Sequence, residues 1–144
     1  MANSIATGVA FRDQDVVNSQ YSLVNATNGQ IGYVAPVGVP ATVTQLTSKS
    51  TGATINAPCG QITMNNAALA NGAVVSFTVT NSSVSAYDIV LVNLAGGATT
   101  AGTYSVFVNS MANGTFGVSV YNISAGSLSE ALKLNFAVFH VATL

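Results

Sequence analysis

Charge is what this sequence has least of. Only 5% of its 144 residues are charged, and the net charge is −1, whereas about 25% is usual. The charged residues are Arg12, Asp13, Asp15, Lys49, Asp88, Glu130 and Lys133. Three basic residues cannot form the patch that neutralises nucleic-acid phosphates or attaches a protein to anionic lipid, so we expect neither partner. So neutral a surface favours self-association, and we expect an assembly to cover it. The alternative is a soluble domain with an unusually neutral polar surface.

Long apolar runs and cysteine pairs are also missing. No stretch approaches the roughly 20 apolar residues of a membrane-spanning helix. The first residues have neither a basic region nor an apolar core, so we expect no secretory signal. The single Cys59 cannot form an internal disulfide, which is consistent with a reducing compartment. The glycosylation sequons, which have no meaning without secretion, are at Asn25, Asn81, Asn113 and Asn122.

The side chains that catalysis requires are scarce. His140 is the single histidine; it shares the apolar face of the last predicted strand, and we expect it at the rim of the core. Cys59 lies in a predicted turn and would need His140 as its base. Asp88 begins a predicted strand, where we expect it to accept backbone N–H bonds in a turn. The sequence therefore predicts no enzyme.

Metal and cofactor sites are not expected either. Zinc needs several His or Cys ligands, and calcium needs a cluster of oxygen ligands that includes carboxylates. Asp13 and Asp15 are the only close acidic pair, and Arg12 beside them indicates ordinary surface electrostatics. The flexible segment 95–102 lacks the lysine and the helix of a phosphate-binding loop. We predict no metal and no cofactor.

What the sequence does contain is β-strand pattern. Residues 74–80 (VVSFTVT) alternate between apolar and hydroxyl side chains, as in a strand with one apolar and one hydroxyl face. Residues 89–92 (IVLV) are apolar throughout, which predicts a strand covered on both faces. Residues 103–109 alternate again, except that Phe107 interrupts the polar face.

Further short strands complete an all-β domain. They are predicted at residues 43–46, 53–56, 61–64, 115–123 and 132–138. Residues 67–70 predict one helical turn, and residues 124–130 predict a loop. About eight strands from Val43 onward are typical of a single β-sandwich. We favour a jelly-roll-like sandwich over a Greek-key one.

The first 40 residues differ from the rest. Pro36 and Pro40 cannot donate to a β-ladder, so a central strand is not expected there, although short strands are predicted at 16–17 and 21–24. We interpret residues 1–40 as an extended N-terminal arm and residues 41–144 as the β-sandwich domain. The aromatic residues Phe11, Tyr21 and Tyr33 need burial, which favours an arm that binds a partner over a poorly ordered terminus.

A resemblance extends over residues 47–142. Its most specific parts are SFTVTNS (76–82), DIVLVN (88–93) and SAGSLSEALKLNFAVF (124–139). They resemble small bacteriophage head decoration proteins of the β-sandwich or jelly-roll type. The resemblance implies a capsid cement protein, made in the host cytoplasm, that binds the outer surface of the major capsid protein shell. It also implies a homo-oligomer, with a trimer favoured and a dimer next. Residues 1–46 do not match the shared pattern, so a contact made by the arm is this protein's own.

Two other functions are considered. A head- or tail-displayed adhesin would bind host surface glycans through loops 65–72, 95–102 and 124–130. Sugars usually stack on aromatic rings, and these loops contain no Trp, Phe or Tyr. A subunit that forms a shell by itself is the third possibility, and the small size of the chain counts against it.

Overall fold

The computed structural model describes residues 24–25, 30–31 and 41–141, and the chain divides into two units, Met1–Val34 and Ala35–Leu144. In the first unit, strand β1 (Val24–Asn25) pairs antiparallel with β2 (Gln30–Ile31). The predicted strand at 16–17 lies outside the described residues. So do the predicted partner-binding residues, Phe11, Tyr21 and Tyr33.

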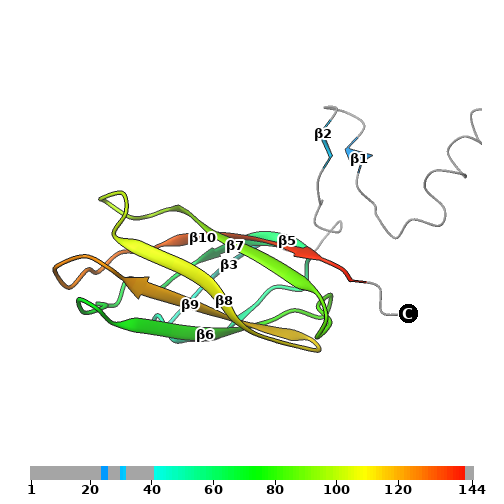
Figure 1. Cartoon of the computed structure of the whole chain (residues 1–144), viewed down its shortest axis with the longest axis horizontal. Coiled ribbons are helices and arrows are strands. Elements are labelled where there is room, and N and C mark those ends of the chain that lie inside the picture. Colours follow the sequence, from blue (N-terminus) through cyan, green and yellow to red (C-terminus); the bar gives the residue numbers. More distant parts are fainter. Residues whose placement is uncertain (1–23, 26–29, 32–40, 142–144) are drawn as a thin grey trace, which may run out of the picture. The chain divides into compact units, whose positions relative to one another are not determined.

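The second unit is all-β, as predicted, with two sheets of four strands each (Figure 1). In spatial order, the first sheet consists of β3 (Thr42–Thr44), β5 (Cys59–Thr63), β10 (Lys133–Phe139) and β7 (Ile89–Gly96). The second sheet consists of β4 (Ala53–Thr54), β6 (Val74–Thr80), β9 (Thr115–Asn122) and β8 (Tyr104–Ala112). The described residues form no helix, and so none that could cross a membrane.

Most neighbouring strands are antiparallel, but each sheet has one parallel pair at an edge. Strand β3 pairs in parallel with β5, and β4 pairs in parallel with β6. Both edge strands are short, with three and two residues. The ladders of β6 with β9 and of β8 with β9 are antiparallel and make up most of the second sheet.

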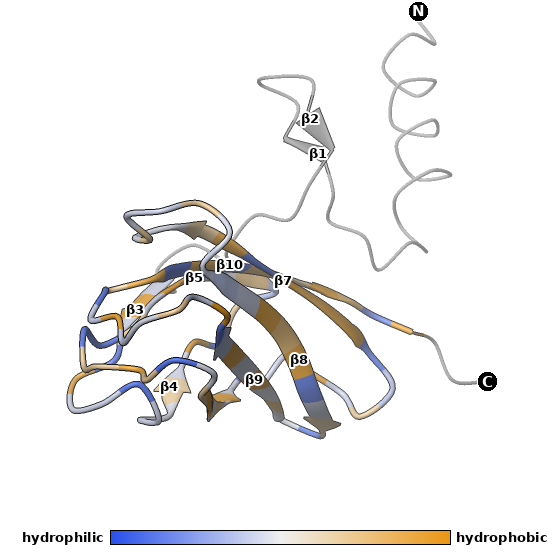
Figure 2. Ribbon diagram, turned by 60° about the vertical axis from the view of Figure 1, so that its left-hand side comes forward, coloured by the Kyte–Doolittle hydropathy of each residue, from blue (hydrophilic) through white to orange (hydrophobic). Residues whose placement is uncertain are grey.

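One hydrophobic core receives side chains from both sheets. The alternating pattern of β6 buries Phe77 and Val79 and exposes the hydroxyl residues between them, as the sequence predicted. The rings of Phe116 on β9 and Phe136 on β10 lie 5.5 Å apart, and they join the second sheet to the first. Apolar colouring accordingly runs along the strands of both sheets (Figure 2).

The prediction that residues 89–92 are covered on both faces is wrong. Val90 is buried, but Ile89 and Leu91 are 57% and 59% exposed. Strand β7 is the last strand of its sheet, and no described element covers its outer face. A continuous apolar run gives no periodicity from which an open face could be recognised.

The predicted helical turn at residues 67–70 is also wrong. Leu69 is buried and forms an isolated antiparallel bridge with Leu128, with backbone N–O distances of 2.9 and 3.0 Å. The backbone groups that would close a helical turn therefore bond to a distant loop. Asn65 Oδ1 also accepts the backbone N–H of Ala67 at 2.8 Å, which stabilises a turn around the side chain instead.

Candidate functional site

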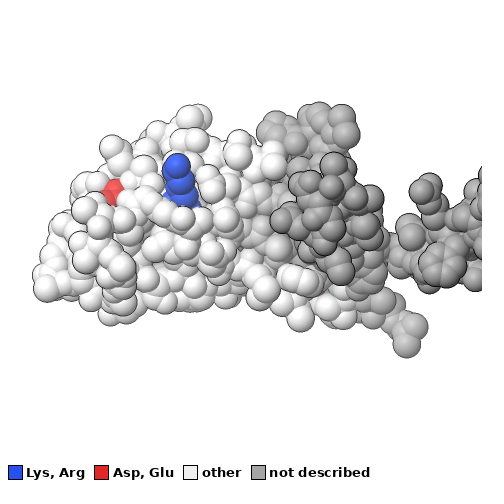
Figure 3. Space-filling view, turned by 90° about the horizontal axis from the view of Figure 1, so that it is seen from above, with Lys and Arg blue, Asp and Glu red and all other residues white. Residues whose placement is uncertain are grey.

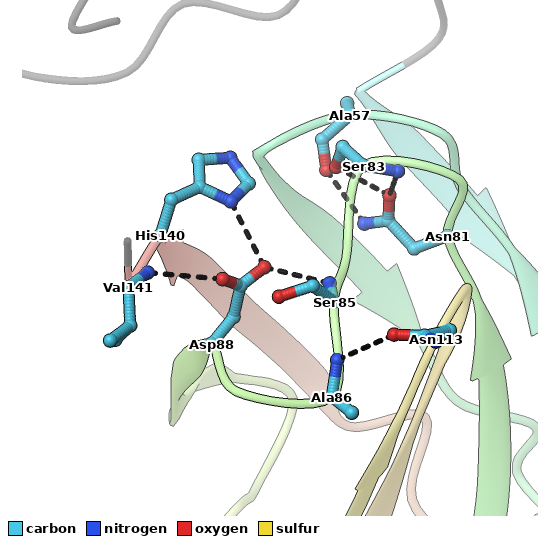
Figure 4. Close-up of polar contacts among 9 residues, drawn as sticks. All are labelled: Ala57, Asn81, Ser83, Ser85, Ala86, Asp88, Asn113, His140 and Val141. Atoms are coloured by element: carbon cyan, nitrogen blue, oxygen red, sulfur yellow. Dashed lines mark hydrogen bonds and ion pairs between the residues drawn. The ribbon is translucent and has the colours of Figure 1, made fainter. Parts of the chain in front are cut away.

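The only side-chain ion pair among the described residues joins Asp88 to His140, which lie 52 residues apart (Figure 4). Asp88 directly precedes β7, and His140 directly follows β10. The His140 Nδ1 atom lies 2.9 Å from Asp88 Oδ2. The carboxylate also accepts the backbone N–H of Ser85 at 2.8 Å and that of Val141 at 3.1 Å. The expectation that Asp88 accepts backbone bonds in a turn is confirmed.

The environments of these two side chains differ. The Asp88 side chain is buried, whereas the His140 side chain is 43% exposed. Burial acts to raise the pKa of Asp88, but the hydrogen bonds from Ser85, Val141 and His140 outweigh it and hold that pKa below its usual value. The Asp88 carboxylate is therefore ionised although it is buried between the start of β7 and the end of β10. The His140 side chain lies on its solvent side.

Cys59 lies in a different setting from the one predicted. The sequence placed it in a turn, but it is the first residue of β5, where it pairs with Ala137 of β10. Burial raises the pKa of its thiol, which favours the protonated, poorly nucleophilic form. Within residues 41–141 and the two short strands before them, no group of three His, Cys, Asp or Glu side chains could hold a metal ion.

Two buried asparagines close the ends of β6 and β9, and sequence reasoning missed them. Asn81 donates from Nδ2 to the carbonyl of Ala57 at 2.7 Å (Figure 4). Asn122 donates from Nδ2 to the carbonyls of Leu69 and Gly126, both at 2.9 Å. Both side chains are fully buried. Their sequons therefore mark structural corners, and the shared Asn-X-Ser after an alternating strand was the available signal.

Lys49 is buried, which is uncommon for a lysine and which the sequence did not indicate. Its ammonium group donates to the carbonyl of Asn65 at 2.6 Å and to the carbonyl of Glu130. Burial lowers the pKa of Lys49, and the charge of Glu130 partly opposes this. Lys49 thus links its own loop to the loops that contain Asn65 and Glu130, at one end of the sheets.

The Glu130 carboxylate continues this cluster. Its Oε1 accepts the backbone N–H of Thr99 at 2.7 Å. Hydrogen bonding to Thr99 holds the pKa of Glu130 low. Burial raises the pKa of Tyr104, and the nearby negative charge of Glu130 raises it further. The interactions join loop 95–102 to loop 124–130.

All three loops of the adhesin hypothesis meet at this end. Besides the Thr99 contact, the Asn71 amide donates to the carbonyl of Ala125 at 3.1 Å, and Leu69 bridges to Leu128. Ala41, the first described residue of the second unit, lies toward the opposite end, near the start of β5. Its carbonyl accepts the N–H of Gln61 at 2.8 Å. The unit therefore has a loop end and a chain-entry end.

The surface of the second unit is nearly uncharged. Of the four charged residues within 41–141, Lys49 and Asp88 are buried, so only Glu130 and Lys133 reach the surface. The face seen in Figure 3 is accordingly almost entirely uncharged. On the outer face of the second sheet, Ser119 Oγ lies 2.8 Å from Ser76 Oγ and accepts the amide of Asn109 at 2.6 Å. Hydroxyl and amide groups thus take the place of charges.

Comparisons with protein-family models, with curated proteins and with solved structures find no match for the chain.

Proposed function

We propose that this chain is a bacteriophage capsid decoration, or cement, protein. It binds the outer surface of the major capsid protein shell and stabilises the shell, and it has a structural role without catalysis. We further propose that the two sheets form one β-sandwich of jelly-roll-like type. The ring contact between Phe116 and Phe136 supports this arrangement. The parallel pairings of β3 and β4 are its departure from an all-antiparallel jelly roll.

The observation that carries the proposal is the scarcity of surface charge. Two of the four charged side chains within residues 41–141 are buried, and apart from Lys133 the exposed strand positions hold hydroxyl, amide or apolar groups. A free monomer usually depends on charge to remain dispersed. A subunit held in a shell needs contact surface instead, and many copies bound together can hold firmly through modest individual contacts.

We propose that the arm, residues 1–40, supplies the capsid contact through Phe11, Tyr21 and Tyr33. Aromatic side chains supply large contact area at interfaces, and they are frequent hot spots. The resemblance further suggests an oligomer, a trimer before a dimer.

A binding experiment on purified shells tests this proposal. The full chain in which Phe11, Tyr21 and Tyr33 are all changed to Ala should no longer sediment with shells, whereas its melting temperature should stay unchanged. The matched control is Tyr87→Ala, which removes an exposed aromatic ring outside the arm and should leave attachment intact. Attachment that survives the triple change, or deletion of residues 1–40, would contradict the role of the arm.

The adhesin remains the second candidate, and the meeting of its three loops at one end favours it. A cryo-EM map of the source virus separates the two. Density on the outer capsid surface, with the arm on capsid subunits, supports the cement function. Density confined to the tail or fibres supports the adhesin, and glycan binding by loops 65–72, 95–102 and 124–130 would then be measured.

A further inference from the structure

The four edge strands of the two sheets are not protected equally. Exposed strand edges invite pairing with other chains, and proteins usually shorten, bulge or charge them. Strands β3 and β4 have only three and two residues, and the pairing of β8 with β9 shifts register between Val108 and Ser110. Strand β7 has eight residues, without charge or proline. Its pairing with β10 shifts register only at the far end, between Lys133 and Leu134, and is uninterrupted from Ile89 to Leu94.

The side chains next to this edge are apolar and incompletely buried. Strands β7 and β8 lie side by side, at the edges of the two sheets (Figures 1 and 2); we call this side the β7–β8 flank. Ile89 and Leu91 are exposed on the outer face of β7. Its inward-facing Val92 and Leu94 are only partly buried, whereas the corresponding Leu134 of the central strand β10 is fully buried.

The β8 side of the flank has the same character. Its partly buried apolar residues are Val106, Val108 and Met111, and Phe107 is exposed beside them. An apolar strip along an unprotected strand edge combines the two features of strand-addition sites: free backbone groups and apolar side chains at alternate positions. The flank is therefore suited to a partner that brings a strand.

We propose that a second copy of this chain docks on the β7–β8 flank, with its β7 antiparallel to β7 of the first copy about a two-fold axis; this dimer takes the place of the trimer that the resemblance favours. Each copy contributes the four strands of its first sheet, so that one sheet continues across the dimer. Ile89 and Leu91 of both copies would then pack on the same face of this sheet, and the backbone edges of both copies would be paired.

A second copy fits better than other occupants because the edge is self-complementary. In a two-fold contact the same residues face one another, so any charge would meet a like charge. Strand β7 carries none, and a charged partner would find no opposite charge on it. The segment 32–40 is a poorer strand, since Pro36 and Pro40 cannot donate to a ladder.

The oligomeric state of the purified full chain tests this pairing without any capsid. Sedimentation equilibrium should show a dimer for the wild type. Leu91→Lys places a charge at the two-fold contact, tolerated in the monomer because Leu91 is exposed, and should raise the dissociation constant at least about tenfold. The matched control, Thr78→Lys, places the same charge on the exposed hydroxyl face of β6 and should leave the dimer intact.

Three results would overturn the proposal: a monomeric wild type, a trimer, or a dimer that Leu91→Lys does not weaken. Should Leu91→Lys fail to fold by circular dichroism, Asn93→Lys on the same exposed face takes its place. Hydrogen exchange supplies a second readout, because β7 amides should be protected in the dimer and exchange faster in the charged variant. A dimer that does not bind shells would contradict the cement function and leave the pairing intact.

Discussion

Asn81 directly follows β6 and Asn122 ends β9, two neighbouring strands that run in opposite directions. The Oδ1 atom of Asn81 accepts hydrogen bonds from the backbone N–H and the hydroxyl of Ser83. Asn122 accepts the same two bonds from Ser124, with the same distances of 3.0 and 2.6 Å. The alternating segments before them, VSFTV and FGVSV, also correspond. One local design therefore closes both ends of the central ladder of the second sheet.

Replacing either asparagine should cost considerable stability. Asn81→Ala or Asn122→Ala removes a buried side chain and leaves carbonyl groups without their donor, and each should lower the free energy of unfolding by about 2–3 kcal/mol. Urea denaturation measures this. Asn113→Ala is the control, since Asn113 is exposed and accepts one bond, from Ala86; it should cost less than about 1 kcal/mol. Equal losses of unfolding free energy in all three variants would contradict the role of Asn81 and Asn122 in closing the strand ends.

The Asp88 carboxylate should make stability depend on pH. Because its pKa is lower in the folded chain than in the unfolded chain, its contribution is present above about pH 4 and is lost as the pH falls through the folded value. Asp88→Asn should lower the free energy of unfolding at pH 7 by about 1–3 kcal/mol. The difference from the wild type should shrink in acid. A constant difference from pH 7 to pH 2 would contradict this.

Gly97 and Gly102 have similar backbone conformations, so replacing each with Ala distinguishes the cost of backbone strain from the cost of steric overlap. Gly97 and Gly102 have φ angles of 86° and 78°. A Cβ at Gly97 would collide with the Ala131 carbonyl, whereas a Cβ at Gly102 would meet nothing within 4 Å. Gly102→Ala should cost about 1–2 kcal/mol, and Gly97→Ala more than about 3 kcal/mol. Comparable melting temperatures for the two variants would show that the loops at this end can separate.

Lys49 should contribute to stability although it is a buried cation. Lys49→Met leaves the carbonyls of Asn65 and Glu130 without their donor and should cost about 1–3 kcal/mol, whereas Lys133→Met on the exposed face should cost less than about 0.5 kcal/mol. Burial lowers the folded pKa of Lys49, so the unfolded chain binds more protons in alkaline solution. Wild-type stability should therefore rise with pH there relative to Lys49→Met; parallel profiles would contradict this.

Where apolar and polar side chains alternate, the sequence predicted both the strand and its buried face. Where they do not alternate, the sequence did not show which face of the strand is buried. The alternation in β6 gave its bounds, Val74–Thr80, and its buried face. The run Ile89–Val92 contains no such period, so the sequence could not reveal that one face of β7 is open. The bridge from Leu69 to Leu128 likewise depends on a partner 59 residues away, beyond any local rule.

The polar clusters were hidden for the same reason. Asp88 and His140 are 52 residues apart, and Lys49 reaches a carbonyl 81 residues away. Composition showed correctly that charge was scarce, but it could not show that two of the four charges in the second unit would be used inside the protein. Only the Asn-X-Ser repeat was a local signal, and its interpretation as a glycosylation sequon concealed it.

The burial of Lys49 and Asp88 has a consequence for how the protein responds to its solvent. With so little charge left at the surface, dissolved salt has almost nothing to screen. Sodium chloride should therefore have little effect on either solubility or association. Sulfate, which strengthens the burial of apolar surface, should act strongly on both. The hydration of serine, threonine and asparagine side chains, rather than mutual repulsion, would keep separate copies in solution.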